Sequence, residues 1–117
     1  MTPEELKART KSFALRIIRL VGALPNDPAT RVMGNQILRS ATSVGANYRA
    51  ACRAQSRPTF ASKLAVVIEE ADETLYWLEL LGESGRVKPE LLKDLQKEGS
   101  ELVAIVTASR KTAQNRG

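Results

Sequence analysis

Proline opens each of four long segments that have helical periodicity, and this punctuation is the strongest constraint on the fold. A proline in the first helical turn loses no intrahelical hydrogen bond, and a preceding Thr, Asp or Ser can cap the free amides. The four starts read Thr2-Pro3-Glu4-Glu5, Asp27-Pro28, Ser56-Arg57-Pro58 and Lys88-Pro89-Glu90. We therefore predict helices over about 3–23, 28–55, 58–82 and 89–112, followed by a frayed tail.

Each segment carries one apolar stripe at steps of three and four residues, which is typical of a helix with one buried face. The stripes contain Leu6, Phe13, Ile17, Leu20 and Leu24; Met33, Ile37, Ala41, Val44 and Tyr48; Leu64, Val67, Ala71, Leu75 and Leu78; and Leu91, Leu95, Leu102, Ile105 and Val106. Short connections favour antiparallel neighbours. We predict an all-α chain, with residues 1–117 forming a single antiparallel up-down-up-down four-helix bundle.

The composition argues against several kinds of site. The chain has no histidine, which removes the usual general base and the commonest metal ligand. We therefore expect no enzymatic activity, no catalytic residue, no metal, no cofactor and no small-molecule substrate. The lone Cys52 fits a reducing compartment, and no apolar run approaches a signal peptide or a membrane span. A cytoplasmic protein without a membrane partner is the expectation.

A basic arc follows the second predicted helix. The formal charge is +5, and residues 1–57 hold 10 Lys/Arg against 3 Asp/Glu, whereas residues 58–117 hold 8 against 10. On a helical wheel the arc spans roughly 80°. It contains Arg31, Arg39, Arg49, Arg53 and, if the helix reaches it, Arg57. Arginine suits phosphate contacts, so these five are the candidate nucleic-acid-binding residues. The alternative is a solvated or subunit-pairing face.

Small residues line the second helix beside its apolar stripe. They are Ser40, Ser43, Asn47, Ala50, Ala51 and Ala54, with Gly45 on the other side of the stripe. Short side chains let a neighbouring backbone approach closely. We interpret this face as a close packing contact, within the bundle or between subunits, and a ligand pocket is the alternative.

The third predicted helix is acidic and apolar on more than one face. Its acids are Glu69, Glu70, Asp72, Glu73 and Glu79, and without histidine they do not form a di-iron motif. Pairing with arginines of the first or second helix, in the same or another subunit, is the favoured interpretation. Val66, Tyr76, Trp77 and Leu80 point away from the buried stripe. This spread predicts a second buried face and hence a homo-oligomer, unless these are scattered exposed side chains. The candidate oligomer interface comprises Ser43, Asn47, Glu69, Glu73, Tyr76, Trp77 and Leu80.

The runs LRSATSVGANYRAACRAQSR and FASKLAVVIEEADETLYWLELL resemble the 23S ribosomal RNA intervening-sequence proteins. The most distinctive element comprises Arg39, Ser40, Thr42, Ser43, Ala46 and Asn47, and the second runs from Glu69 to Thr74. The resemblance implies an antiparallel four-helix bundle, usually a homopentamer, with no established enzymatic activity. A more distant similarity is to the accessory variability determinant of diversity-generating retroelements, a basic pentamer that binds nucleic acid and a reverse transcriptase.

Two functional hypotheses follow. The first is a non-enzymatic oligomeric bundle whose arginines contact RNA or DNA backbone without reading sequence. The second is a protein-interaction or scaffold module, in which the arginines serve subunit assembly and nucleic acid plays no part.

Overall fold

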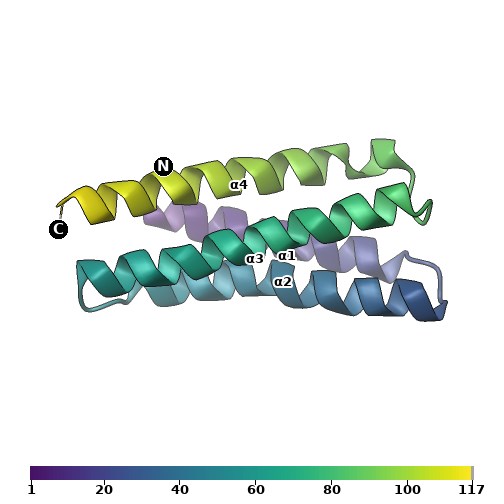
Figure 1. Cartoon of the computed structure of the whole chain (residues 1–117), viewed down its shortest axis with the longest axis horizontal. Helices are drawn as coiled ribbons and strands as arrows, with labels where there is room; N and C mark the ends of the chain where they lie inside the picture. The colour runs from purple at the N-terminus through teal and green to yellow at the C-terminus, as the bar shows by residue number, and fades with distance from the viewer. Residues whose placement is uncertain (117) are drawn as a thin grey trace.

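The computed structural model describes residues 1–116, with side chains to residue 115, and consists of four helices. They are α1 (Pro3–Gly22), α2 (Pro28–Cys52), α3 (Arg57–Glu83) and α4 (Pro89–Arg116). Successive helices run in opposite directions and lie side by side, so the two termini fall near the same end (Figure 1). The result is a rod of 47 × 22 × 20 Å. The prediction of an all-α four-helix bundle is confirmed, and residues 1–116 contain no strand.

Three helix starts use the caps that the sequence predicts. Thr2 forms a capping box, in which its hydroxyl accepts from the Glu5 amide at 3.1 Å and the Glu5 carboxylate accepts from the Thr2 amide at 3.3 Å. Asp27 accepts from the Thr30 amide at 3.0 Å. Ser56 in turn caps α3. Because these bonds join residues only three apart, local sequence is enough to predict them.

The helix ends differ more from the prediction. The second helix ends at Cys52 rather than at residue 55, and residues 53–55 connect it to Ser56, which is extended (φ −146°, ψ 160°) and caps α3. Arg57 therefore begins α3 and does not extend the arginine arc of α2. At the other end of the chain, α4 continues to Arg116, so the tail expected to fray from Ala113 onward is helical to that residue. Burial of Ala113 accounts for part of this extension.

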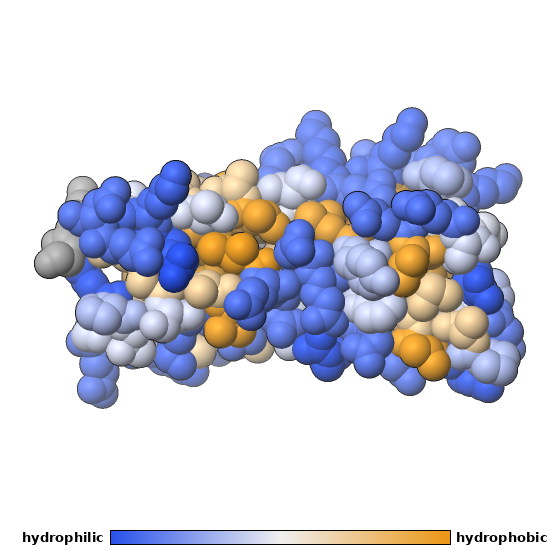
Figure 2. Space-filling model, viewed as in Figure 1, coloured by the Kyte–Doolittle hydropathy of each residue, from blue (hydrophilic) through white to orange (hydrophobic). Residues whose placement is uncertain are grey.

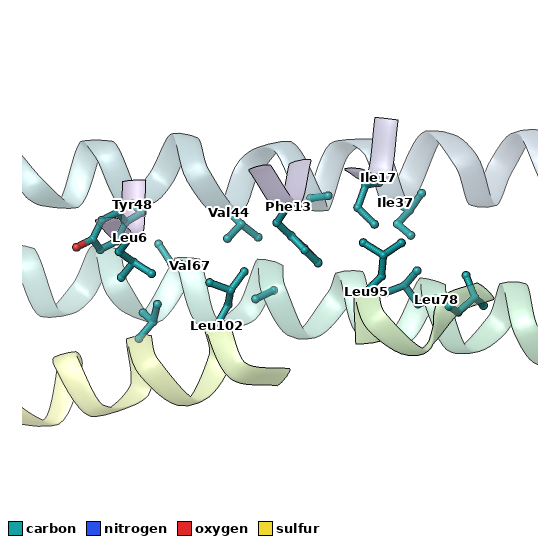
Figure 3. Close-up of a cluster of buried hydrophobic side chains, with 14 of the residues drawn as sticks. Leu6, Phe13, Ile17, Ile37, Val44, Tyr48, Val67, Leu78, Leu95 and Leu102 are labelled. Atoms are coloured by element: carbon teal, nitrogen blue, oxygen red, sulfur yellow. The ribbon is translucent and has the colours of Figure 1, made fainter. Parts of the chain in front are cut away.

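The core is a continuous, mainly aliphatic cluster with contributions from all four helices, and it also contains Phe13 and Tyr48 (Figure 3). Phe13, Ile37, Val44, Leu78 and Leu102 are each fully buried within it. α3 packs extensively against both α2 and α4, whereas α1 packs mainly against α2 and less against α4. No Cα atom of α1 lies within 8 Å of a Cα atom of α3, so these two helices occupy opposite corners of the bundle.

The small residues of α2 mediate close contacts inside the chain. On one side, the buried Thr74 hydroxyl of α3 donates to Ser40 Oγ at 2.9 Å, and Ser40 Oγ donates to the Ile37 carbonyl at 3.3 Å. On the other side, a Cβ on Gly45 would lie only 3.3 Å from Thr10 Oγ1 of α1. The predicted role of this face in close packing is confirmed for these positions, and the contacts are within the bundle.

Candidate nucleic-acid interface

The basic arc lies on the side of α2 that faces away from the core. Residues 28–56 contain no Asp or Glu, so α2 supplies no acid to neutralise its own arginines. Arg31, Arg49 and Arg53 are all exposed. At a rise of 1.5 Å per residue, roughly 33 Å separates the first of them from the last. The three arginines therefore lie along most of one side of the rod.

Arg39 differs from the other arginines because α3 provides two acids beside it. Its Nη1 lies 3.2 Å from Glu70 Oε2, and its Nη2 donates to Glu73 Oε2. The hydrogen bond from Arg39 lowers the pKa of Glu73, and a second one, from Trp77 Nε1 at 3.0 Å, lowers it further. The Arg39 side chain nevertheless remains 48% exposed. The predicted pairing of α3 acids with an arginine of the second helix is thus found within the chain, at Arg39.

Arg31, Arg49 and Arg53 form no ion pair with the side chains that the structure describes. Arg31 Nη1 donates to Asn26 Oδ1 at 3.0 Å. Arg57 is exposed at the first residue of α3, where it lines three surface depressions. Of the five candidates, Arg31, Arg49 and Arg53 therefore form the exposed arginine row, a name kept below for these three residues.

Helix α1 extends the positive surface but also contains an ion-paired arginine. Lys11 and Arg19 are exposed. Arg9, in contrast, crosses to α4, where it contacts Glu98 at 2.7 Å and Glu101 at 2.8 Å. The hydrogen bond from Arg9 lowers the pKa of Glu98. We did not predict this pair from the sequence. The spacing of the two acids by three residues, which places them on one helix face, was the available signal.

The candidate oligomer-interface residues fall into two groups. Ser43 and Asn47 are half-buried on the side of α2 that carries Ser40, and Asn47 Nδ2 donates to the Ser43 carbonyl at 2.9 Å. The α3 group is on the outer side of that helix. Glu69 and Tyr76 are exposed, whereas Glu73, Trp77 and Leu80 are half-buried. The Tyr76 and Trp77 rings meet edge to face, with centroids 5.1 Å apart.

A groove of about 760 Å³ lies between Met1 and Pro3, at the start of α1, and the part of α4 around Ala113. Its apolar lining includes Leu6, Tyr48, Phe60 and Ile105, and Arg57 contributes a charged side chain. Burial raises the pKa of Tyr48, which keeps its phenol neutral. Among residues 1–116 there is no cluster of three or more His, Cys, Asp or Glu suited to a metal ion. None of the helices in the same range is long and apolar enough to cross a membrane.

Comparison with known proteins places this bundle in a family. Residues 4–108 match the family described as 23S rRNA-intervening sequence protein. A similar solved structure is the crystal structure of a protein with unknown function, from the S23 ribosomal protein family of Bacteroides thetaiotaomicron. It is 39% identical, with a TM-score of 0.87, and the alignment covers 95% of this chain and 99% of that one. No curated protein matches the chain. Because the match to the family spans nearly all four helices, the chain belongs to the 23S rRNA-intervening sequence protein family.

Proposed function

We propose that the chain is a non-enzymatic, oligomeric four-helix bundle that binds the phosphate backbone of RNA or DNA through the exposed arginine row. The observation that carries this proposal is the exposure of Arg31, Arg49 and Arg53 along a helix without acids. Arginine forms strong hydrogen bonds with phosphate oxygens, and its charge displaces counterions from the backbone. The chain has no histidine, so the usual acid-base chemistry has no candidate residue.

The same surface argues for binding without sequence preference. Tyr76 is the aromatic residue among the large apolar side chains exposed in residues 1–115, and it belongs to α3 rather than to the arginine row. Stacking of bases on aromatic side chains is the usual way to hold single strands. The arginine row offers charge and hydrogen bonds alone, which suits phosphate contacts.

Binding to RNA and DNA should depend steeply on salt and on the arginine row. We expect the logarithm of the association constant to fall linearly with the logarithm of the salt concentration. The triple variant Arg31→Glu, Arg49→Glu and Arg53→Glu should bind more weakly. The slope of the logarithm of the association constant against the logarithm of the salt concentration should also become less steep, by about one unit for each phosphate contact removed. Fluorescence anisotropy with labelled RNA and DNA duplexes, from low to physiological salt, measures both quantities.

A matched control separates specific contacts from total charge. Lys93, Lys97 and Lys111 are exposed on α4, and changing all three to Glu alters the net charge by the same amount. This control should retain more affinity and a steeper slope than the arginine variant. Wild-type protein that binds neither nucleic acid at low salt would refute the proposal, as would equal losses in the two triple variants.

The oligomeric part of the proposal is supported by the outer side of α3, where Tyr76 is 52% exposed and Val66 39% exposed. Apolar side chains grouped on one helix face are typical of a surface that a partner covers. The family resemblance favours five copies. Light scattering at micromolar concentration measures the mass, and a mass of 12.8 kDa, that of one chain, would refute assembly.

The alternative is a scaffold module in which arginines serve assembly alone, and the pairing of Arg39 with acids, here within one chain, is the observation nearest to it. The Arg39 guanidinium already joins two helices through Glu70 and Glu73. On this alternative, the triple arginine variant would lose mass in light scattering, and the wild type would not bind nucleic acid. If the exposed arginine row binds nucleic acid, the triple arginine variant would keep the mass of the wild-type oligomer and would lose affinity for RNA and DNA.

A further inference from the structure

Two helices present exposed apolar side chains in the middle of the rod. On α1, Leu15 is 47% exposed and Ile18 is 46% exposed. On α3, the corresponding side chains are Val66 and Tyr76. Figure 2, which views the rod from the side of α3, shows hydrophobic surface interrupted by hydrophilic residues. Neither face has a partner within the chain.

The charges that predominate around these two faces have opposite signs, although Lys63 of α3 lies near Val66. Residues 6–22 of α1 contain Lys and Arg but no Asp or Glu, and Lys11 and Arg19 are exposed beside the apolar pair. Residues 64–83 of α3 contain Asp and Glu but no Lys or Arg, and Glu69 and Asp72 are exposed. Complementary charge around an apolar centre is the arrangement that orients two protein surfaces toward each other.

The fold prevents these faces from meeting within one molecule. α1 and α3 each pack against α2 and α4, and they lie at opposite corners of the bundle. Their outer faces therefore point in different directions, and only a second copy can bring an α3 face onto an α1 face. A twofold contact of α1 with α1, or of α3 with α3, would instead oppose like charges, which is unfavourable.

The two faces also match in height along the rod. Gly45 lies beside Thr10, and Ser40 lies beside Thr74, so these contacts relate the levels of α1 and α3 through α2. All three helices rise by 1.5 Å per residue. Counting from the two contacts, Lys11 is level with Glu69, and Ile18 is level with Tyr76, to within about one residue. Copies aligned at equal height would therefore oppose lysine to glutamate and an apolar side chain to an aromatic one.

We propose that the outer face of α3 in one copy packs on the outer face of α1 in the next, an inference that rests on the proposed assembly. Such a contact uses two different surfaces of the chain. A row of copies joined in this way has a free α1 face at one end and a free α3 face at the other. Repetition of such a contact closes a ring, of an odd or an even number of copies, when the rotation from one copy to the next divides a full turn. Each copy keeps the same orientation to the ring axis. α2 lies between α1 and α3 in the bundle, so the arginine rows of all copies face the same side of the ring wall and form one basic surface.

Charge reversal tests this pairing. Variant A carries Lys11→Glu and Arg19→Glu, and variant B carries Glu69→Lys and Asp72→Lys. All four residues are exposed and form no ion pair among the described side chains, so both variants should retain the wild-type helical signal in circular dichroism. Light scattering should show each variant reduced from the wild-type mass toward the 12.8 kDa of one chain. A chain that carries all four substitutions should recover the oligomeric mass.

The control reverses two positive charges, as variant A does, but on α4. This variant carries Lys97→Glu and Lys111→Glu, both at exposed positions of α4, and it should keep the mass of the wild-type oligomer. If variant A assembles like the wild type, the α1 face is not the interface, although the proposed assembly stands. If only variant B dissociates, α3 pairs with another surface. A four-substitution chain that folds but stays at 12.8 kDa would also overturn the pairing. A monomeric wild type would instead refute the proposed assembly itself.

Discussion

Replacing Leu102 by alanine should lower the free energy of unfolding by about 2–5 kcal/mol. Leu102 is fully buried in the core, where Figure 3 shows it among side chains from the other helices. The substitution removes apolar contacts and leaves a cavity that the surrounding helices can fill only in part. Urea denaturation followed by circular dichroism measures the loss. All samples should have one protein concentration, because the stability of an oligomer depends on it.

Leu91 provides the matched control on the same helix. It is 68% exposed, so the same change from leucine to alanine should cost less than about 0.5 kcal/mol. Alanine is also slightly the better helix former. Similar losses at the two positions would contradict the assignment of Leu102 to the core and of Leu91 to the surface.

Replacing Gly45 by leucine should destabilise the bundle by about 1–3 kcal/mol. Glycine inside a helix costs about 1 kcal/mol relative to alanine, so backbone propensity alone predicts stabilisation. The packing opposes this gain. A Cβ at this position would already lie 3.3 Å from Thr10 Oγ1 and 3.6 Å from the Thr10 backbone carbon. The further atoms of leucine would push α1 away from α2. The backbone of Thr10 cannot move aside as the end of a flexible side chain can.

Ala46→Leu is the appropriate comparison, because Ala46 follows Gly45 in the same helix and its side chain is exposed. This variant should unfold within about 0.5 kcal/mol of the wild type. A Gly45→Leu protein more stable than the wild type would show that helix propensity outweighs packing here. The close approach of α1 to α2 would then not depend on glycine.

The helix starts could be predicted from the sequence because their causes are local. Thr2, Asp27 and Ser56 each cap an amide three residues away, so the signal and its effect lie within one turn. The helix ends were harder to predict. Residues 53–55 had to connect α2 to the Ser56 cap of α3, and Ala113, near the end of α4, is buried against the rest of the bundle.

At the candidate site, too, the features with local causes could be predicted and those that depend on contacts between helices could not. Helical periodicity alone predicts that arginines of α2 share one side, because residues three and four apart are neighbours. It does not predict that Arg39 would be paired while Arg49 would not. That difference arises because Glu70 and Glu73 of α3 lie beside Arg39. Arg9 likewise finds Glu98 on α4, almost the length of the chain away in sequence.

By itself, the sequence determined the number of helices, their buried stripes and the separation of basic from acidic segments, since all of these depend on residue order and helical period. The tertiary structure decided which charges are neutralised, which small residues contact which helix, and that α1 and α3 lie at opposite corners. An ion pair or an outward face depends on the distance between helices remote in sequence. That distance is set by how the core side chains pack.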